Sequence, residues 1–140
     1  MNNVLLDTDV ILDFLLDREP FSQYSTEIFH LCETKKINGY ITPLSYSNVY
    51  YILRRSTRHQ KVIAGLKQLL SITDVLSMPV EVVANALYSK FNDFEDSLQH
   101  YSALKNPQIE VILTRNVKDY SHSEIGVMSP ESYLKLYRTT

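Results

Sequence analysis

Two short apolar runs constrain the fold most strongly, because each run ends at a polar or acidic residue. Residues 3–6 read NVLL and precede Asp7, while residues 109–113 read IEVIL and precede Thr114. Short apolar runs that are separated by helix-like segments are typical of buried strands in a parallel sheet. Further short strands are expected at residues 40–42, 74–76 and 126–128. The alternation predicts an α/β fold of three layers (α/β/α) with a central, mostly parallel sheet of about four or five strands.

Helical spacing of apolar residues fills the intervals between these strands. Thr8 is expected to cap a first short helix, and Asp93 to cap a later one. Proline near the start of several segments fits helix N-termini. Helices are expected at about 8–14, 20–35, 43–55, 58–70, 80–90, 93–104 and 130–137. No repeat or linker-like stretch divides the chain, so a single domain over residues 1–140 is expected.

Composition excludes several classes of protein and leaves others open. The chain has 140 residues and a net charge of −2, with one cysteine and three glycines. One cysteine excludes an intramolecular disulfide framework and any CxxC zinc site, and so few glycines argue against nucleotide-cradling loops. No apolar run approaches the roughly 20 residues of a membrane span, and no signal peptide is recognisable. A cytoplasmic location without membrane association is the resulting expectation.

Charge is distributed unevenly along the chain. Arg54, Arg55, Arg58 and Lys61 are close together in the middle, whereas acidic residues gather at 93–96. A basic strip beside an acidic pocket suits an enzyme that acts on a polyanion, although a solvated helix face explains the strip equally well.

The acidic residues are the candidates for chemistry. Asp7 directly follows the first strand, so it is a metal ligand at the sheet edge or simply a helix cap. Asp93 and Asp96 are three residues apart in the sequence DFED, where capping is the competing explanation. Asp9 has a weaker claim as a cap or an extra ligand, and Asp13 is expected to face solvent.

The segment TRNVKD adds further oxygen ligands after the second apolar run. Thr114 and Asn116 follow the strand directly, and Asn116 is expected to cap a turn that presents Asp119. Carboxylate, amide and hydroxyl oxygens suit Mg²⁺ or Mn²⁺ rather than zinc. The four histidines show no metal-ligand spacing.

Taken together, LLDTDVILD, SYSNVYYILRR, DFEDSLQHYSAL and VILTRNVKDY resemble the PIN-domain family, and within it the branch of VapC-like toxin ribonucleases. The resemblance covers essentially the whole chain. It implies a PIN-like fold and metal-dependent endoribonuclease activity, as the toxin of a toxin–antitoxin pair. Carried over residue by residue, it assigns catalysis and binding of Mg²⁺ or Mn²⁺ to Asp7, Asp96 and Asp119, with Asp93 as a further metal candidate. It assigns supporting roles to Thr8, Thr114 and Asn116, and Asn48 is a further supporting candidate. Independently of the resemblance, the basic residues Arg54, Arg55, Arg58 and Lys61 are expected to contact the RNA backbone.

One residue departs from the family pattern. A second acid, normally a glutamate, is replaced by Asn48 in SYSNVYYIL. Fewer charged ligands weaken cation binding, although Asp9, Asp93 or Glu95 could compensate. The alternative function is therefore a catalytically weak or inactive PIN-fold module that binds RNA or a protein partner, and a scaffold in which the acids only cap helices is a third. The partners that the resemblance implies are an RNA substrate, an antitoxin protein and a second copy of the chain in a homodimer.

Overall fold

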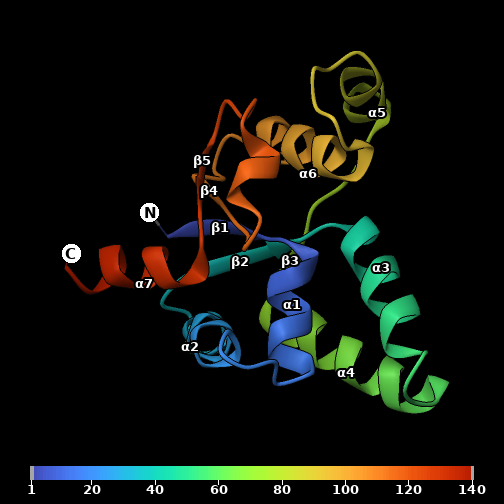
Figure 1. Ribbon diagram of the computed structural model, residues 1–140, viewed down its shortest axis with the longest axis vertical. Helices are drawn as coiled ribbons and strands as arrows, with labels where there is room; N and C mark the ends of the chain where they lie inside the picture. The colour runs from blue at the N-terminus through green and yellow to red at the C-terminus, as the bar shows by residue number, and fades with distance from the viewer. Residues whose placement is uncertain (1, 140) are drawn as a thin grey trace.

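A five-stranded parallel sheet forms the centre of the protein. The computed structural model describes residues 2–139. The strands are β1 (Asn3–Leu6), β2 (Asn38–Ile41), β3 (Asp74–Val75), β4 (Val111–Leu113) and β5 (Gly126–Met128), in the spatial order β3-β2-β1-β4-β5. Every neighbouring pair is parallel, so the carboxyl ends of all the strands lie at one edge (Figure 1). The predicted parallel α/β sheet is confirmed.

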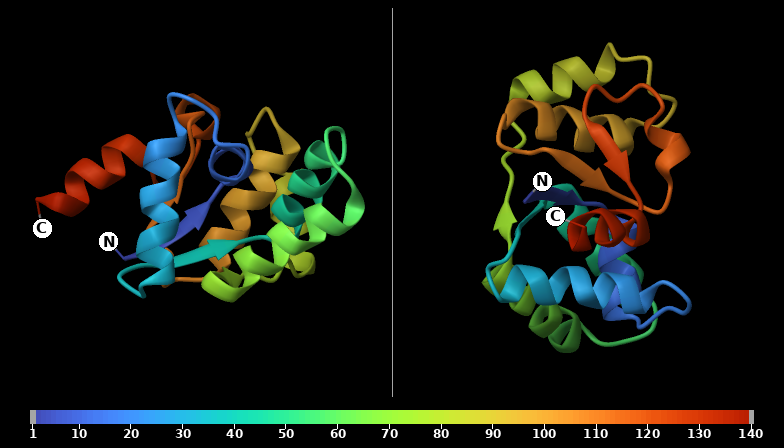
Figure 2. Two further views of the ribbon diagram at one scale, coloured as in Figure 1. Left: turned by 90° about the horizontal axis from the view of Figure 1, so that it is seen from below. Right: turned by 90° about the vertical axis from the view of Figure 1, so that its left-hand side faces the viewer.

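Helices cover both faces of this sheet. They are α1 (Thr8–Leu15), α2 (Ser22–Glu33), α3 (Pro43–Leu53), α4 (His59–Ile72), α5 (Val80–Leu87), α6 (Phe94–Lys105), the 3₁₀ turn η1 (Val117–Tyr120) and α7 (Pro130–Arg138). Figure 2 shows α5 and α6 on one side of the strands, with α1, α2, α4 and α7 on the other. The predicted three-layer α/β/α arrangement is therefore confirmed. None of the helices in residues 2–139 is long and apolar enough to cross a membrane.

Alternation along the central strands builds one core on each face. Val4 and Leu6 of β1 belong to the larger core, with α1, α2 and α4, whereas Leu5 faces the smaller core beneath α6. In the same way Ile112 of β4 joins the smaller core while its two neighbours join the larger one. Val4–Leu6 of β1 and all of β4 are apolar because both faces of these strands are buried, as in other doubly covered parallel sheets.

The observed helix starts correct two predictions. Asp7, not Thr8, is the N-cap of α1: its backbone is extended (φ −76°, ψ 162°) and its Oδ1 accepts a hydrogen bond from the Thr8 backbone N–H at 2.8 Å. Pro20 precedes α2 rather than starting it, since the helix begins at Ser22. Asp93 does cap α6, as predicted, by accepting from the Asp96 N–H at 2.9 Å.

Candidate active site

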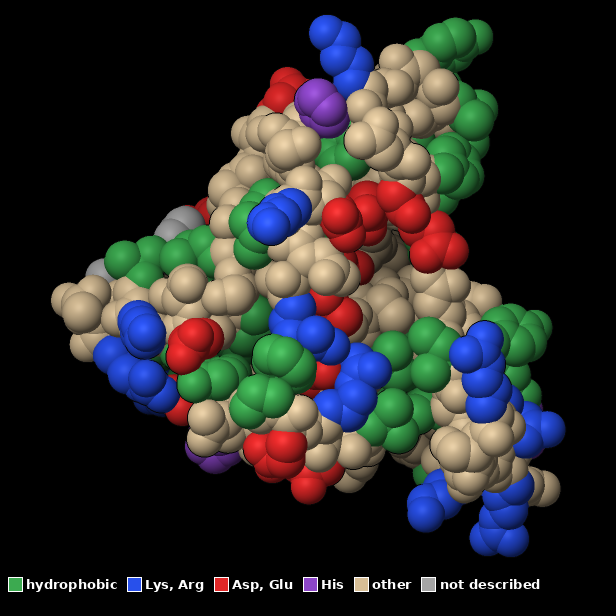
Figure 3. All heavy atoms as spheres, viewed as in Figure 1, with side chains coloured by type: hydrophobic (Ala, Val, Ile, Leu, Met, Phe, Trp, Pro, Cys, Tyr) green, Lys and Arg blue, Asp and Glu red, His purple; other side chains and the backbone are tan. Residues whose placement is uncertain are grey.

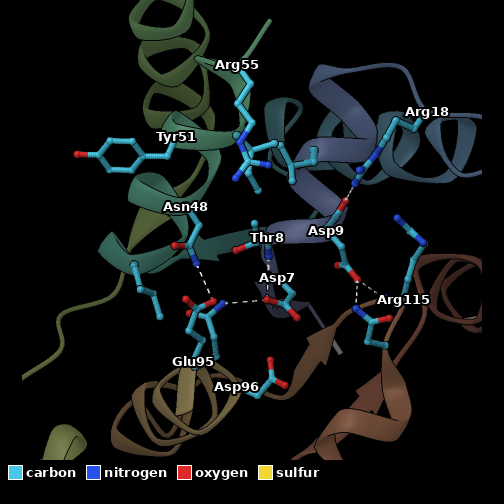
Figure 4. A pocket seen from close by; sticks show the side chains of 15 residues that line it. Asp7, Thr8, Asp9, Arg18, Asn48, Tyr51, Arg55, Glu95, Asp96 and Arg115 are labelled. Atoms are coloured by element: carbon cyan, nitrogen blue, oxygen red, sulfur yellow. Dashed lines mark hydrogen bonds between the residues drawn. The ribbon is translucent and has the colours of Figure 1, made fainter. Parts of the chain in front are cut away.

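A cavity of about 530 Å³ opens beyond the carboxyl ends of β1 and β4. Its acidic wall consists of Asp7 and Asp9 from the start of α1, together with Glu95 and Asp96 from the first turn of α6. Figure 4 shows these carboxyl groups gathered around one space. Residues almost 90 positions apart meet here because strand ends and helix starts share the same sheet edge.

Asp7 is buried and accepts three hydrogen bonds. Its side chain is 8% exposed, and Oδ1 accepts from Gln99 Nε2 at 3.2 Å in addition to the Thr8 N–H. Oδ2 accepts from the buried Tyr120 hydroxyl at 3.1 Å. These three donors come from three separate segments and fix the orientation of the carboxylate.

A buried polar network supports Asp7 from behind. Gln99 also donates to Ser45 Oγ at 3.0 Å and contacts Thr42, while Thr8 Oγ1 donates to the same Ser45 oxygen at 3.0 Å. The network joins α1, α3 and α6 across the sheet edge. Thr8 was predicted as a supporting residue, but the sequence analysis did not identify Gln99, Ser45 or Tyr120.

Asp9 lies beside Asp7 and is bound by the segment that follows β4. Its Oδ2 accepts from the Arg115 backbone N–H at 3.0 Å, from Asn116 Nδ2 at 3.2 Å and from Thr114 Oγ1 at 3.3 Å. Its Oδ1 is buried without a hydrogen-bond partner. Burial, followed by repulsion from Asp7, raises the pKa of Asp9 to about 6. Thr114 and Asn116 thus contact Asp9, which sequence reasoning had ranked below Asp7.

Asp96 completes the acidic wall from the opposite layer. Burial is the main cause that raises its pKa to about 7, and the charges of Asp93, Asp7 and Asp119 add to it. Asp93 and Asp119 are themselves exposed and lie outside the residues that line the cavity. The structure therefore brings Asp7 and Asp96 together, and places the other two predicted acids at the margin.

Asn48, which stands where the family pattern has an acid, lies next to an acid from another helix. Its Nδ2 donates to Glu95 Oε2 at 3.1 Å, and both residues line the cavity (Figure 4). A carboxylate is thus present close to the position that lacks one, but it comes from α6 rather than α3.

The prediction that Asp13 faces solvent is wrong. It is fully buried and forms ion pairs with two arginines, through Arg18 Nε at 2.8 Å and Arg115 Nε at 2.6 Å. Both arginines line the cavity. Neither was a candidate from sequence, although an acid within the apolar stretch ILDFL, five residues before an arginine, is a signal for a buried ion pair.

Only part of the predicted basic strip reaches the site. Arg55 lines the cavity next to Tyr51 on α3. Arg54 instead donates to the Thr57 carbonyl at 2.8 Å, and neither Arg58 nor Lys61 is among the lining residues of the described chain.

Comparison with known proteins identifies the family. Residues 3–118 match a family model described as PIN domain. The chain belongs to the PIN-domain family. Among curated proteins, no sequence matches this PIN domain.

Solved structures share its fold at low sequence identity. VapBC2 from Rickettsia felis, bound to a DNA fragment from its promoter, is 14% identical with a TM-score of 0.66 and covers 90% of this chain and 97% of that chain. VapBC-1 from nontypeable Haemophilus influenzae is 18% identical with a TM-score of 0.64, covering 91% and 98%. VapC20 from Mycobacterium tuberculosis, a toxin that cleaves the sarcin–ricin loop, is 12% identical with a TM-score of 0.60, covering 79% and 87%.

The donor set of this PIN domain fits a hard divalent cation. Within residues 2–139, no three His, Cys, Asp or Glu side chains converge as a ready-made metal cage. Mg²⁺ does not need one, because it commonly keeps several waters and uses one or two carboxylates plus substrate phosphate. The unpartnered, buried Oδ1 of Asp9 beside Asp7 and the crowding of carboxyl groups around Asp96 are features that a cation would relieve.

Proposed function

We propose that this PIN domain is a metal-dependent endoribonuclease that hydrolyses RNA phosphodiester bonds. The observation that supports it is the single cavity that Asp7, Asp9, Glu95 and Asp96 line at the carboxyl edge of the sheet. When bound there, Mg²⁺ or Mn²⁺ would lower the pKa of an attacking water and offset the charge on the phosphate.

The roles of the residues follow from their contacts. Asp7 is held in place by Thr8, Gln99 and Tyr120, so it anchors the cation with little reorganisation. Asp96 completes the cation site from α6. Asp119 and Asp93 lie at its margin, where their charges raise the pKa of Asp96 and attract cations. No side-chain nucleophile is required.

Glu95 supplies the carboxylate that Asn48 does not. The hydrogen bond from Asn48 orients Glu95 along the cavity wall, and Arg55 on α3 is available to contact the RNA backbone. Accordingly, an Asn48→Glu substitution should place two carboxylates against each other and lower cleavage.

RNA cleavage with purified protein tests this function. Structured RNA would be incubated with Mg²⁺, with Mn²⁺ and with chelator, alongside Asp96→Asn and the charge-matched control Asp74→Asn, whose exposed aspartate lies on β3. We expect cation-dependent cleavage by the wild type and by the control, and none by Asp96→Asn. Equal cleavage by all three proteins would indicate a contaminating nuclease and contradict the proposal.

A second candidate function is a PIN-fold module without catalysis that binds RNA or a protein. Asn48 favours it, since the position lacks a charged ligand. If several RNAs remain intact with the wild type and Asn48→Glu creates cleavage, the site is degenerate and this second function is correct.

We further propose that the protein is the toxin of a toxin–antitoxin pair and forms a homodimer. The structural neighbours in Rickettsia felis and Haemophilus influenzae are VapBC proteins, which supports an antitoxin partner. Helix α5 presents Val80 and Leu87 to solvent, and its C-cap residue Tyr88 is exposed as well, which supports self-association through this surface. Light scattering after gel filtration should give a dimer for the wild type and a monomer for Leu87→Lys, and a monomeric wild type would contradict the dimer.

A further inference from the structure

Two arginines share one buried carboxylate at the edge of the cavity. Asp13 accepts from Arg18 Nε through Oδ1 and from Arg115 Nε and Nη2 through both oxygens, at 2.6–3.2 Å. The Arg115 guanidinium also lies 4.0 Å from the centroid of the Phe21 ring. Two cations against one anion leave one positive charge uncompensated within this cluster.

The nearby Asp9 does not cancel that charge through a direct ion pair. Its carboxylate is bound by backbone and side-chain N–H groups of residues 115 and 116, and Arg18 Nη2 reaches only the Asp9 carbonyl oxygen, at 3.4 Å. Within the described chain, neither guanidinium has a hydrogen bond from its Nη1 group. N–H donors therefore remain for a ligand.

Burial of Asp13 makes this a preorganised arrangement. Asp13 is 0% exposed, whereas Arg18 and Arg115 are 37% and 28% exposed and reach the cavity. A guanidinium that is already fixed by a carboxylate loses little conformational entropy when it binds an oxyanion, and its planar donors match a phosphate. Figure 4 shows both arginines across the space from Glu95 and Asp96, and Figure 3 shows a hollow with acidic side chains on one side and basic ones on the other.

We propose that Arg18 and Arg115, held by Asp13, bind a backbone phosphate of RNA adjacent to the phosphate that is cleaved. The inference rests on the proposed function, since it takes the cavity to be the RNA site. A chain of phosphates fits both walls, with one phosphate at the cation bound by the acids and a neighbouring one at the arginines. An acidic peptide would account for the arginines alone, because it has no phosphodiester for a cation at the acidic wall to activate.

Binding measurements in a nuclease-inactive background test the inference separately from catalysis. Asp96→Asn protein would bind a short fluorescein-labelled single-stranded oligoribonucleotide in chelator, followed by fluorescence anisotropy over a range of salt concentrations. Adding Arg18→Gln should weaken binding roughly tenfold. It should also reduce the slope of log Kd against log salt by about 0.7, the value for one phosphate contact on a single strand.

Two control variants separate the effect of the Arg18 side chain from the loss of any positive charge and from misfolding. Arg138→Gln removes the same charge from α7, far from the cavity, and should leave affinity and slope unchanged. Arg18→Lys keeps a positive charge next to Asp13 and should bind RNA with intermediate affinity. It therefore still tests the phosphate site if Arg18→Gln fails to fold. Equal binding by the parent, Arg18→Gln and Arg18→Lys would overturn the inference. The inference would also be overturned if a polyglutamate peptide bound the parent and lost as much affinity as RNA does on Arg18→Gln substitution. That result would assign the arginines to an acidic protein partner.

These outcomes are independent of the cleavage assay. Cation-dependent cleavage combined with Arg18-independent binding would retain the ribonuclease and reject the phosphate site. Arg18-dependent RNA binding without cleavage would retain the phosphate site and reject the ribonuclease.

Discussion

Removing the negative charge of Asp96 should stabilise the metal-free protein, although this side chain is proposed to be essential for activity. Burial and the charges of Asp93, Asp7 and Asp119 raise its pKa from 3.8 to about 7 in the folded state. The folded protein therefore binds this proton more tightly than the unfolded chain does. Between about pH 4 and pH 7 the contribution of Asp96 to the free energy of unfolding falls as pH rises. Above pH 7 Asp96 is ionised in both states, and its destabilising effect no longer changes with pH.

The size of the effect follows from the same pKa. Moving the pKa of one carboxyl group from 3.8 to about 7 corresponds to at most about 4 kcal/mol. Asp96 is only partly buried, so solvent screening reduces this to about 1–2 kcal/mol. Asp96→Asn should then be more stable than the wild type by about 1–2 kcal/mol at pH 8. The difference should shrink to a small fraction of this at pH 4, where the folded carboxyl group is protonated and the pH is close to the unfolded pKa of 3.8.

Urea unfolding in chelator at pH 4, 6 and 8 measures the difference, with Asp74→Asn as a charge-matched control that should show no such pH dependence. Adding Mn²⁺ at pH 8 should reverse the order, because a cation that binds only the folded wild type stabilises it by mass action. The reasoning is refuted if Asp96→Asn is no more stable than the wild type in chelator at pH 8. A gain of the same size at pH 4 would also refute it, since the gain would then have no connection to ionisation.

Two further pairs of substitutions test the buried ion cluster and the packing of β2. Asp13→Asn should lower the free energy of unfolding by about 2–3 kcal/mol, because two guanidinium groups lose their buried counterion. The exposed Asp17→Asn should be nearly neutral, and equal effects in urea unfolding would contradict the buried ion cluster. Gly39→Ala would bring a methyl group to 2.7 Å from Cys32 Sγ and should cost about 1–3 kcal/mol. A methyl group added at Gly65, inside α4, would meet no atom within 4 Å, so Gly65→Ala should raise the thermal midpoint. A lower midpoint for Gly65→Ala would contradict the open space at this position.

The sequence was sufficient to predict those parts of the site that lie next to a strong local signal. Asp7 follows the apolar run Val4–Leu6, and Asp96 lies three residues after the N-cap Asp93 in a recognisable helix start, so periodicity and capping rules locate both. The parallel sheet was predictable for the same reason, since Val4–Leu6 of β1 and all of β4 are apolar. Helix ends such as that of α5 were less accurate, because no glycine or proline marks the point where the helix stops at Leu87.

Long-range partners could not be read from local patterns. Asp13 and Arg115 are 102 residues apart, and their contact depends on β4 lying beside β1. Asp13 was expected to face solvent because it is charged, whereas Arg18 and Arg115 pair with it and bury it. Gln99 was overlooked because a lone glutamine in a polar helix has no signal of its own; only the folded structure places it against Asp7.

The strand order also determines when the cavity can exist during synthesis. β1 is made first, but it pairs with β4, which is made more than a hundred residues later. Asp7 and Asp9 therefore leave the ribosome long before Arg115 and Tyr120, which hold them in position. A nascent chain that has not yet docked β4 has neither the fixed carboxylates nor the arginine pair on Asp13. If the protein is a ribonuclease, the nascent chain therefore stays inactive toward the RNA of its own ribosome until β4 has been made and has paired with β1.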